Sequence, residues 1–462
     1  MKQKFLRVIM VSLFFLSDAA LFSSSAQAIM WEKKAEFFSR AYQEAEEDNA
    51  YEDAQAYDSR LRMENKVGFA EDLVMILNAD VRYENFQWGR TDDDFDIVLR
   101  EAFLGVRKEN YSFSVGRQIV TWGKLDNVVI VDQVSPQSYR WFVLYDKEER
   151  KEPELMVKYN YYADTFELEA IYLPFFEPSQ VSYFGPGWST FGRLQQAVAD
   201  STAYTASQKN TVSQIRIEET EDLSNKRIKD SEGGIRLRTK MSDVDVSFYY
   251  FNFHNRMPTL QEATANGNVV KAFLFVPTDA MLATLDALNP TAEDSTLYKK
   301  HDRLNMVGFD FETVVKQCGV RGEVGLFFDM PYLQSDFAYT RKNTAMAGIG
   351  IDYTASNNAY MNLQFVETII MDYEPLFSQE QYSHEITLEL TKHFFRGKVL
   401  CSIEGDYRIS YSDWMLNPEI RYIFNNGFEA AFGGFLFNGS RATLFGRFAE
   451  RDIVYLECKL PF

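Results

Sequence analysis

The chain has 462 residues and a formal net charge of −19, from 48 Lys and Arg against 67 Asp and Glu. An acidic balance of this size lacks the basic footprint of nucleic-acid-binding proteins, so we expect no nucleic-acid partner. The three cysteines, Cys318, Cys401 and Cys458, are scattered and odd in number, which argues against a disulfide framework and a metal cluster. We therefore expect no metal and no cofactor.

The first 28 residues have the organisation of a secretory signal peptide. A basic start is followed by a short apolar run from Val8 to Leu16, and a small-residue stretch ends in Ala26-Gln27-Ala28. The apolar run is too short to cross a bilayer, which takes roughly 20 residues. We predict that residues 1–28 are removed by cleavage after about Ala28.

Residues 29–48 are predicted to form a short amphipathic helix or leader ahead of the strands. This segment combines Trp31, the pair Phe37-Phe38 and Tyr42 with charged residues, and it ends in an acidic run. Two roles remain open for it: a solvated leader, and a periplasmic cap or plug.

From about residue 49, apolar and polar residues alternate with a period of two. Ile235 and Leu237 alternate with Arg236 and Arg238, for example, and similar stretches recur towards the C-terminus. This period is typical of strands with one apolar face. No stretch beyond residue 28 reaches 18 uninterrupted apolar residues, so we expect no membrane-spanning helix. The aromatic content of 15% suits the aromatic girdles of a transmembrane barrel.

The connections between these strands alternate between short and long. Short turns are expected near 109–110, 163–164, 241–243, 316–318, 355–357, 395–397 and 425–427, and long loops at 85–94, 121–152, 175–231, 255–301, 330–341, 370–381 and 438–451. Short periplasmic turns and long outer loops characterise outer-membrane barrels. We therefore predict an all-β fold, a transmembrane antiparallel up-and-down β-barrel of about 18 strands over residues 49–462. The alternative count is 16, because the first strand would have to come from residues 49–56, which are poor in strand formers.

The C-terminal strand alternates in the same way and ends on an aromatic ring. Its apolar face carries Val454, Leu456, Cys458, Leu460 and Phe462. Such a strand resembles the signal that the outer-membrane assembly machinery recognises in Gram-negative barrel proteins. We expect Leu456, Leu460 and Phe462 to carry this signal, with the barrel assembly machinery, outer-membrane lipid and lipopolysaccharide as partners.

The best-defined motif is Gly116-Arg117-Gln118 at a strand end, followed by Trp122-Gly123, Asp126, Asp132 and Ser135-Pro136. It resembles a family of uncharacterised Gram-negative outer-membrane β-barrels, porin-like, in which an Asn-Pro-like turn stands where this chain has Ser135-Pro136. The resemblance covers roughly residues 57–178. It implies a barrel in the outer membrane and implies no particular solute.

Arg117 and the loop after it form the first candidate site. An arginine facing lipid costs about 2–4 kcal/mol near the midplane, so we expect Arg117 to point inward or to sit at headgroup level. We expect Trp122 to mark the outer interface. Loop 121–152 is predicted to fold inward as a constriction, with Arg117 paired to one of its carboxylates, such as Asp126 or Asp132. This pair is either a structural salt bridge or part of a direct solute contact.

Charged residues that alternate with the apolar face are predicted to line the interior. They are Arg236, Arg238 and Lys240 on one strand, Glu167 and Glu169 on another, and Glu389, Glu404, Asp406, Arg408, Glu419, Arg421 and Glu429 on later ones. Two interpretations remain open: a transverse field that filters solutes by charge, and a network of satisfied pairs that braces the barrel. Both signs are present, so no ion selectivity is predicted.

These features favour a channel for passive or weakly selective passage of small solutes, including hydrophobic or amphipathic ones. The alternatives are a polysaccharide export channel and a structural or adhesive surface barrel. The four histidines show no specific catalytic spacing, so we expect no enzyme. The apolar outer segment 270–290 either contacts the lumen mouth, lipopolysaccharide or a hydrophobic solute, or packs against the other loops.

Overall fold

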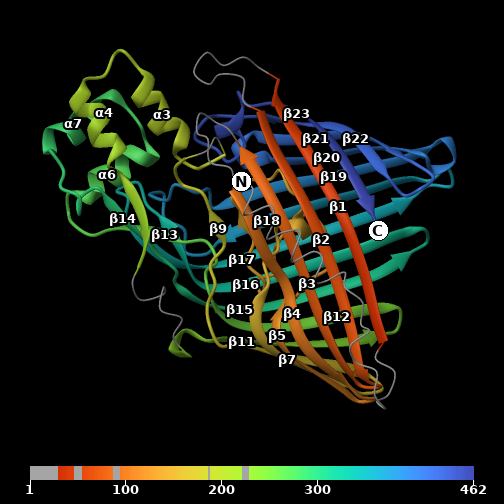
Figure 1. Cartoon of the computed structure of the whole chain (residues 1–462). Coiled ribbons are helices and arrows are strands. Elements are labelled where there is room, and N and C mark those ends of the chain that lie inside the picture. Colours follow the sequence, from red (N-terminus) through yellow and green to blue (C-terminus); the bar gives the residue numbers. More distant parts are fainter. Residues whose placement is uncertain (1–29, 46–54, 87–93, 186–187, 221–227) are drawn as a thin grey trace.

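The structure is a computed structural model that describes residues 30–45, 55–86, 94–185, 188–220 and 228–462. Within these residues, eighteen strands form one antiparallel sheet that closes on itself into a barrel (Figure 1). The predicted signal peptide, residues 1–28, lies outside the described residues.

The barrel strands follow the order of the chain, each paired with its neighbours. They are β1 (Met30–Glu44), β2 (Gln55–Ala70), β3 (Leu73–Phe86), β4 (Asp94–Arg107), β5 (Tyr111–Gln118), β7 (Glu154–Tyr162), β8 (Phe166–Leu173), β11 (Glu232–Met241), β12 (Val244–His254), β15 (Arg303–Val315), β16 (Cys318–Leu333), β17 (Tyr339–Thr354), β18 (Ala359–Ile370), β19 (Tyr382–Phe394), β20 (Val399–Arg408), β21 (Asp413–Ile423), β22 (Glu429–Asn438) and β23 (Ile453–Pro461).

Shorter elements lie in the connections. They are the strands β6 (Ser138–Tyr139), β9 (Gln180–Val181), β10 (Arg216–Glu219), β13 (Thr259–Glu262) and β14 (Thr296–Lys300), the helices α2 (Lys147–Arg150), α3 (Gly192–Asp200), α4 (Ala206–Ser213), α6 (Gly267–Phe275) and α7 (Asp279–Leu288), and the 3-10 turns η1 (Ile228–Asp230), η2 (Phe395–Gly397), η3 (Ile409–Tyr411) and η4 (Gly446–Phe448). None of the helices among the described residues is long and apolar enough to cross a membrane.

The outer surface of the barrel is an apolar belt. On β11, Ile235 and Leu237 are exposed on the outside, whereas Arg236 and Arg238 turn inward. Large exposed apolar side chains alternate in the same way on most other barrel strands, including Phe113 on β5. Exposure of this kind is explained if acyl chains, and not water, cover the surface.

The first and last strands close the barrel. β1 pairs with β2 on one edge and with β23 on the other, and the backbones of Ala35 and Phe462 exchange two hydrogen bonds. A closed sheet leaves no unpaired edge, which a strand in lipid requires because water is absent there. The predicted count of 18 strands is therefore confirmed, and the alternative of 16 is wrong.

The helix predicted for residues 29–48 is wrong. Met30–Glu44 is the first barrel strand, with Phe38, Arg40 and Tyr42 buried on its inner side. The adjacent aromatics and the Ala, Glu and Lys residues favour a helix locally, but pairing on both edges outweighs that propensity. An ascending strand does precede β2, as predicted, but it is β1 and not residues 49–56, most of which lie outside the described residues.

The short turns gather at one end of the barrel and the long loops at the other, here called the turn end and the loop end (Figure 1). At the loop end, α3, α4, α6 and α7 share a core of their own, which includes Val270, Phe273 and Leu285. The apolar segment 270–290 thus packs against other outer loops, which confirms that alternative. The outer helices stand beside the barrel mouth in Figure 1.

Candidate functional site

Residues 119–153, the inserted loop, connect β5 to β7 and fold into the barrel. Trp122, Ile130 and Val131 are buried against inner-wall residues such as Phe251 and Met306. The prediction that this loop turns inward is confirmed. Apolar burial of this kind stabilises the loop inside the barrel, because each large side chain removed from water contributes about 1.5–3 kcal/mol.

Glycines on the inner wall make room for the loop. A Cβ added at Gly348 would lie 2.5 Å from Cδ1 of Leu125, and one at Gly308 would lie 2.7 Å from Cγ1 of Val131. Gly234 leaves similar space beside the Trp122 ring. The wall opposite β5 is therefore shaped to receive the loop.

Carboxylates of the same wall hold the loop backbone. Glu323, 2% exposed, accepts hydrogen bonds from the backbone nitrogens of Lys124 and Leu125, the latter at 2.6 Å. Arg321 pairs with Asp126 at 2.5 Å. Gly123 is required here, because its φ is +86° and a Cβ would contact the Glu323 carboxylate. The Trp-Gly motif therefore places the loop on its anchor.

The returning half of the loop is tied to the opposite wall. Glu149 pairs with Arg60 at 2.6 Å and with Arg62 at 2.8 Å. Burial disfavours the charged carboxylate, but the Arg62 hydrogen bonds and the charges of Arg60, Arg62 and Arg100 hold the pKa of Glu149 well below its usual range. The loop is thus fixed to both sides of the barrel.

Two cavities lie on either side of the loop tip. The loop-side cavity, about 460 Å³, is lined by outer-loop residues such as Met257 and Leu444. The turn-side cavity, about 500 Å³, is lined by Arg321 and the loop tip. Both cavities share four lining residues: Asn127, Asp146, Lys147 and Glu404. These four residues line the place where the two cavities meet, called the constriction here.

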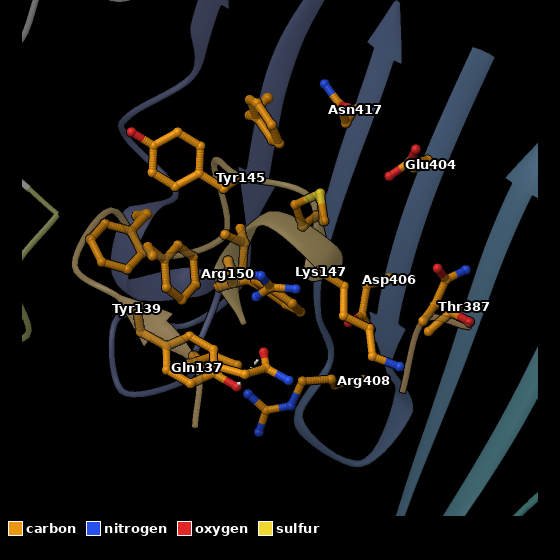
Figure 2. A pocket seen from close by; sticks show the side chains of 18 of the residues that line it. Gln137, Tyr139, Tyr145, Lys147, Arg150, Thr387, Glu404, Asp406, Arg408 and Asn417 are labelled. Carbon is orange, nitrogen blue, oxygen red and sulfur yellow. Dashed lines mark hydrogen bonds between the residues drawn. The ribbon is translucent and has the colours of Figure 1, made fainter. Parts of the chain in front are cut away.

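The loop-side cavity is two-faced. One side is aromatic, with Phe142, Trp188 and Phe445 among the lining residues, and the other is the polar inner face of β19 and β20. In Figure 2 the side chains of Tyr139 and Tyr145 lie on one side of the pocket and those of Thr387 and Glu404 on the other. An apolar face combined with a polar one suits amphipathic molecules.

Arg117 does not line the interior. Its neighbours on alternate positions of β5, Tyr111, Phe113 and Val115, are exposed on the outer surface, so Arg117 faces outward next to the loop end of its strand. Its guanidinium pairs with Glu177 at 3.1 Å, and not with a carboxylate of the inserted loop as predicted. The location at the strand end explains how an outward arginine is tolerated, because headgroups and water are reachable there.

Two other predictions for this motif need correction. Trp122 is 2% exposed inside the barrel, where its ring nitrogen donates to Glu169 at 2.7 Å, so it does not mark the outer interface. Asp132 is buried and pairs with Lys151 at 2.9 Å, so it braces the loop and lines neither cavity. Asp126, in contrast, lines the turn-side cavity.

The predicted basic ladder is paired with its own neighbours. Arg236 meets Glu169 and Arg238 meets Glu167, each at 3.2 Å across β11 and β8. These four residues and the exposed Lys240 line neither cavity described above. Of the two interpretations left open, the bracing network fits this part of the wall.

Glu404 and Arg408, both on β20, line the loop-side cavity. The sequence analysis did not single out Glu323. An acidic residue at an inward position between the glycines of β16 is a pattern that could have indicated it. The role of Lys147 was also missed, because its contacts with the Leu125 and Val128 carbonyls arise only from the loop conformation.

Residues 22–428 match the model of a family described as "protein of unknown function (DUF1302)". The chain belongs to this family. The match to the DUF1302 model includes the inserted loop and both of its anchoring walls. Among curated protein sequences, none shows significant similarity to this DUF1302 chain.

Solved porin structures resemble the DUF1302 chain in fold. Acinetobacter baumannii OccAB1 superposes with a TM-score of 0.51, with 8% identity over 94% of this chain and 96% of that chain. Pseudomonas aeruginosa OpdQ has a TM-score of 0.48, with 8% identity over 94% and 98%. Salmonella typhi OmpF, in a complex with daunomycin, has a TM-score of 0.45, with 9% identity over 94% and 97%. At these identities the likeness concerns the fold alone, and the predicted porin-like barrel is confirmed.

Proposed function

We propose that this protein is an outer-membrane channel for passive passage of small solutes, including amphipathic ones. The observation that carries the proposal is the pair of cavities on either side of the inserted loop, which share Asn127, Asp146, Lys147 and Glu404 as lining. Two internal cavities that meet at one constriction provide a route from the loop end to the turn end.

The membrane assignment is supported by the outer belt of apolar side chains and by the closure of the sheet between β1 and β23. Outer-membrane lipid and lipopolysaccharide are the surroundings that such a belt requires. Leu456 and Phe462 stand exposed on the outer face of the last strand, where the barrel assembly machinery would meet them. The signal peptide ending at about Ala28 would deliver the chain to that machinery.

The inserted loop limits what can pass. Cavities of about 460 and 500 Å³ are of the size that holds a small molecule, and the loop occupies the space between them. A polysaccharide chain would need the loop to leave the barrel, against the anchors at Glu323 and Glu149. Small solutes need no such rearrangement.

The test is conductance of the purified protein in planar bilayers, together with uptake of small sugars by liposomes that contain it. We expect discrete current steps, and larger steps when residues 124–129 are replaced by a short Gly-Ser linker. The heat-unfolded protein serves as the control. A folded barrel that gives neither current nor uptake would overturn the proposal and leave a structural or adhesive role.

A further inference from the structure

One stretch of the inner wall departs from the charge pairing seen elsewhere. On β8 and β11, opposed residues carry opposite charges, as in the pair Arg236–Glu169. On β19 and β20, Glu389 lies directly opposite Glu404. Like charges in this position destabilise a sheet, so the arrangement is one that stability does not favour. Departures of this kind are expected at functional sites.

The carboxylates of this wall lack partners. Neither Glu389 nor Glu404 forms a hydrogen bond or an ion pair of its side chain within the part of the chain that the structure describes. Glu404 lines both cavities, at their shared constriction. It is therefore a carboxylate that any solute crossing from one cavity to the other must pass.

The next rung towards the loop end adds two more oxygens without partners. Thr387 and Asp406 lie opposite each other and both line the loop-side cavity. The Thr387 hydroxyl and Asp406 Oδ1 are buried, and neither finds a hydrogen-bond donor or acceptor among the described residues. Thr387 is only 3% exposed. Buried polar atoms of this kind call for a partner that the protein itself does not supply.

Glu389, Glu404, Asp406 and Thr387 together are called the oxygen strip. The rung above it is different, because Glu385 there faces Arg408, which also contacts Asp413. The strip therefore begins next to the rung on which an acid lies opposite a base, and it extends from there towards the turn end, to the constriction.

Among the described residues, the cations of the inserted loop form no ion pair with the strip. The Lys147 ammonium donates to the carbonyls of Leu125 and Val128, at 3.1 and 2.9 Å. Arg150 has no carboxylate within 4.0 Å in the described residues, and its Nε is buried without a partner. Asp146, exposed beside Lys147, adds a further negative charge. The loop-side cavity is lined by four carboxylates (Asp146, Glu385, Glu404 and Asp406) and four cations (Lys147, Arg150, Arg408 and Arg447), so the strip is distinguished by its oxygens without partners and not by the net charge of this cavity.

The turn-side cavity, in contrast, has an excess of negative charge. Its lining contains five carboxylates and three cations, and the Arg321 and Lys124 charges are already paired with Asp126 and Glu312. A cation that leaves the constriction therefore enters a region of negative potential. An anion meets the same potential as a barrier.

The opposite side of the loop-side cavity indicates what kind of cation fits. Phe142, Trp188 and Phe445 present aromatic rings to the same space that the strip faces. Aromatic faces attract ammonium groups and also accommodate apolar bodies. An organic ammonium ion satisfies both sides of the cavity at once.

We propose that the oxygen strip makes this passage selective for cations, and that organic ammonium ions with an apolar body are its favoured solutes. The inference rests on the channel function proposed above and specifies its substrate class. Rows of carboxylates on a pore wall raise the local concentration of cations and exclude anions in this way. The partner-free oxygens of Thr387 and Asp406 provide ligands that replace part of the hydration shell.

The first test is the reversal potential of the full-length channel in a potassium chloride gradient. We expect permeability to potassium to exceed that to chloride, and the ratio to fall by about threefold or more in the E389Q/E404Q double variant. The matched control is E367Q, which removes a charge from the outward side of β18. Heat-modifiable migration on gels shows whether each variant is folded. If the double variant does not fold, the single variant E404Q is measured in its place.

The second test compares three probes of one shape: benzylamine, benzyl alcohol and benzoate. We expect liposomes containing the protein to take up the amine fastest, and the advantage to disappear in the double variant. A conducting channel with no cation preference, or one that prefers benzoate, would overturn this inference and leave the channel function intact. The absence of any current would instead overturn the channel function itself.

Discussion

The carboxylate of Glu323, on β16, accepts a hydrogen bond from the backbone nitrogen of Leu125 at 2.6 Å, at the tip of the inserted loop. The same carboxylate also accepts a hydrogen bond from the backbone nitrogen of Val131 at 3.4 Å. One side chain thus holds two points of the loop that are six residues apart. The position of the loop inside the barrel depends on this side chain, and so does the separation of the two cavities.

Replacement of Glu323 by Ala is expected to release the loop tip. The backbone donors that it now satisfies would remain buried without an acceptor, which costs about 1–3 kcal/mol for each group. We expect larger and noisier single-channel currents, together with a lower unfolding midpoint in denaturant. Glu323→Gln, which keeps one acceptor, should fall between the two. Currents identical to the wild type in the Ala variant would contradict the anchoring role.

A larger residue at Gly348 is expected to displace the loop by sterics alone. A Cβ there would lie 2.5 Å from Leu125, so Gly348→Val should push the tip away from the wall and cost about 1–3 kcal/mol. Gly68→Ala is the control, because its Cβ would find no atom nearer than 3.7 Å. Conductance and denaturant unfolding of the two variants distinguish the steric displacement of the loop from the effect of removing any glycine from a strand. If Gly348→Val and Gly68→Ala changed conductance and unfolding to the same extent, the steric explanation would be wrong.

The closing seam of the barrel is expected to depend on Arg40. This side chain lies opposite Glu457 on β23, and the two buried groups pair at 2.5 Å. Arg40→Ala leaves Glu457 with Arg421 as its remaining partner, so we expect a loss of about 3 kcal/mol or less. The measurement is the temperature at which the folded form disappears on gels.

The exposed pair of Lys66 and Glu32, which joins β1 to β2, is the matched control for the seam. Exposed pairs contribute about 0–1 kcal/mol, so Lys66→Ala should leave that temperature nearly unchanged. An Arg40 variant as heat-resistant as the Lys66 variant would show that the backbone pairing alone closes the barrel.

The attachment of Glu149 to Arg60 and Arg62 is expected to survive mild acid. The pKa of Glu149 lies below its unfolded value of about 4.3, so its contribution is complete above that pH and is lost as the pH falls through the lower folded value. Amide protection factors over residues 145–153 should therefore stay constant from about pH 8 to pH 5. Glu149→Gln should lower them throughout this range. A wild-type loss of protection near pH 6 would contradict the assignment.

Much of the fold could be predicted from the sequence. Alternation with period two, short turns opposite long loops and an aromatic last residue led to a closed barrel of 18 strands, because these patterns depend only on neighbours along the chain. The same local logic failed at Met30–Glu44, where helix-forming residues belong to a strand. Pairing with β2 and with β23, which lies more than 400 positions away, decides its conformation.

The candidate site shows where such patterns end. The sequence by itself determined, for strands with clear alternation such as β11, which side chains face lipid and which face inward, and it located a loop that turns into the barrel. Only the tertiary structure decided which inward charges neutralise one another. Arg236 meets Glu169 whereas Glu404 meets Glu389, because strand register brings residues together that no local pattern relates. The tertiary structure also placed Trp122 and Lys147 inside the barrel, because the loop conformation depends on contacts with walls formed by distant strands.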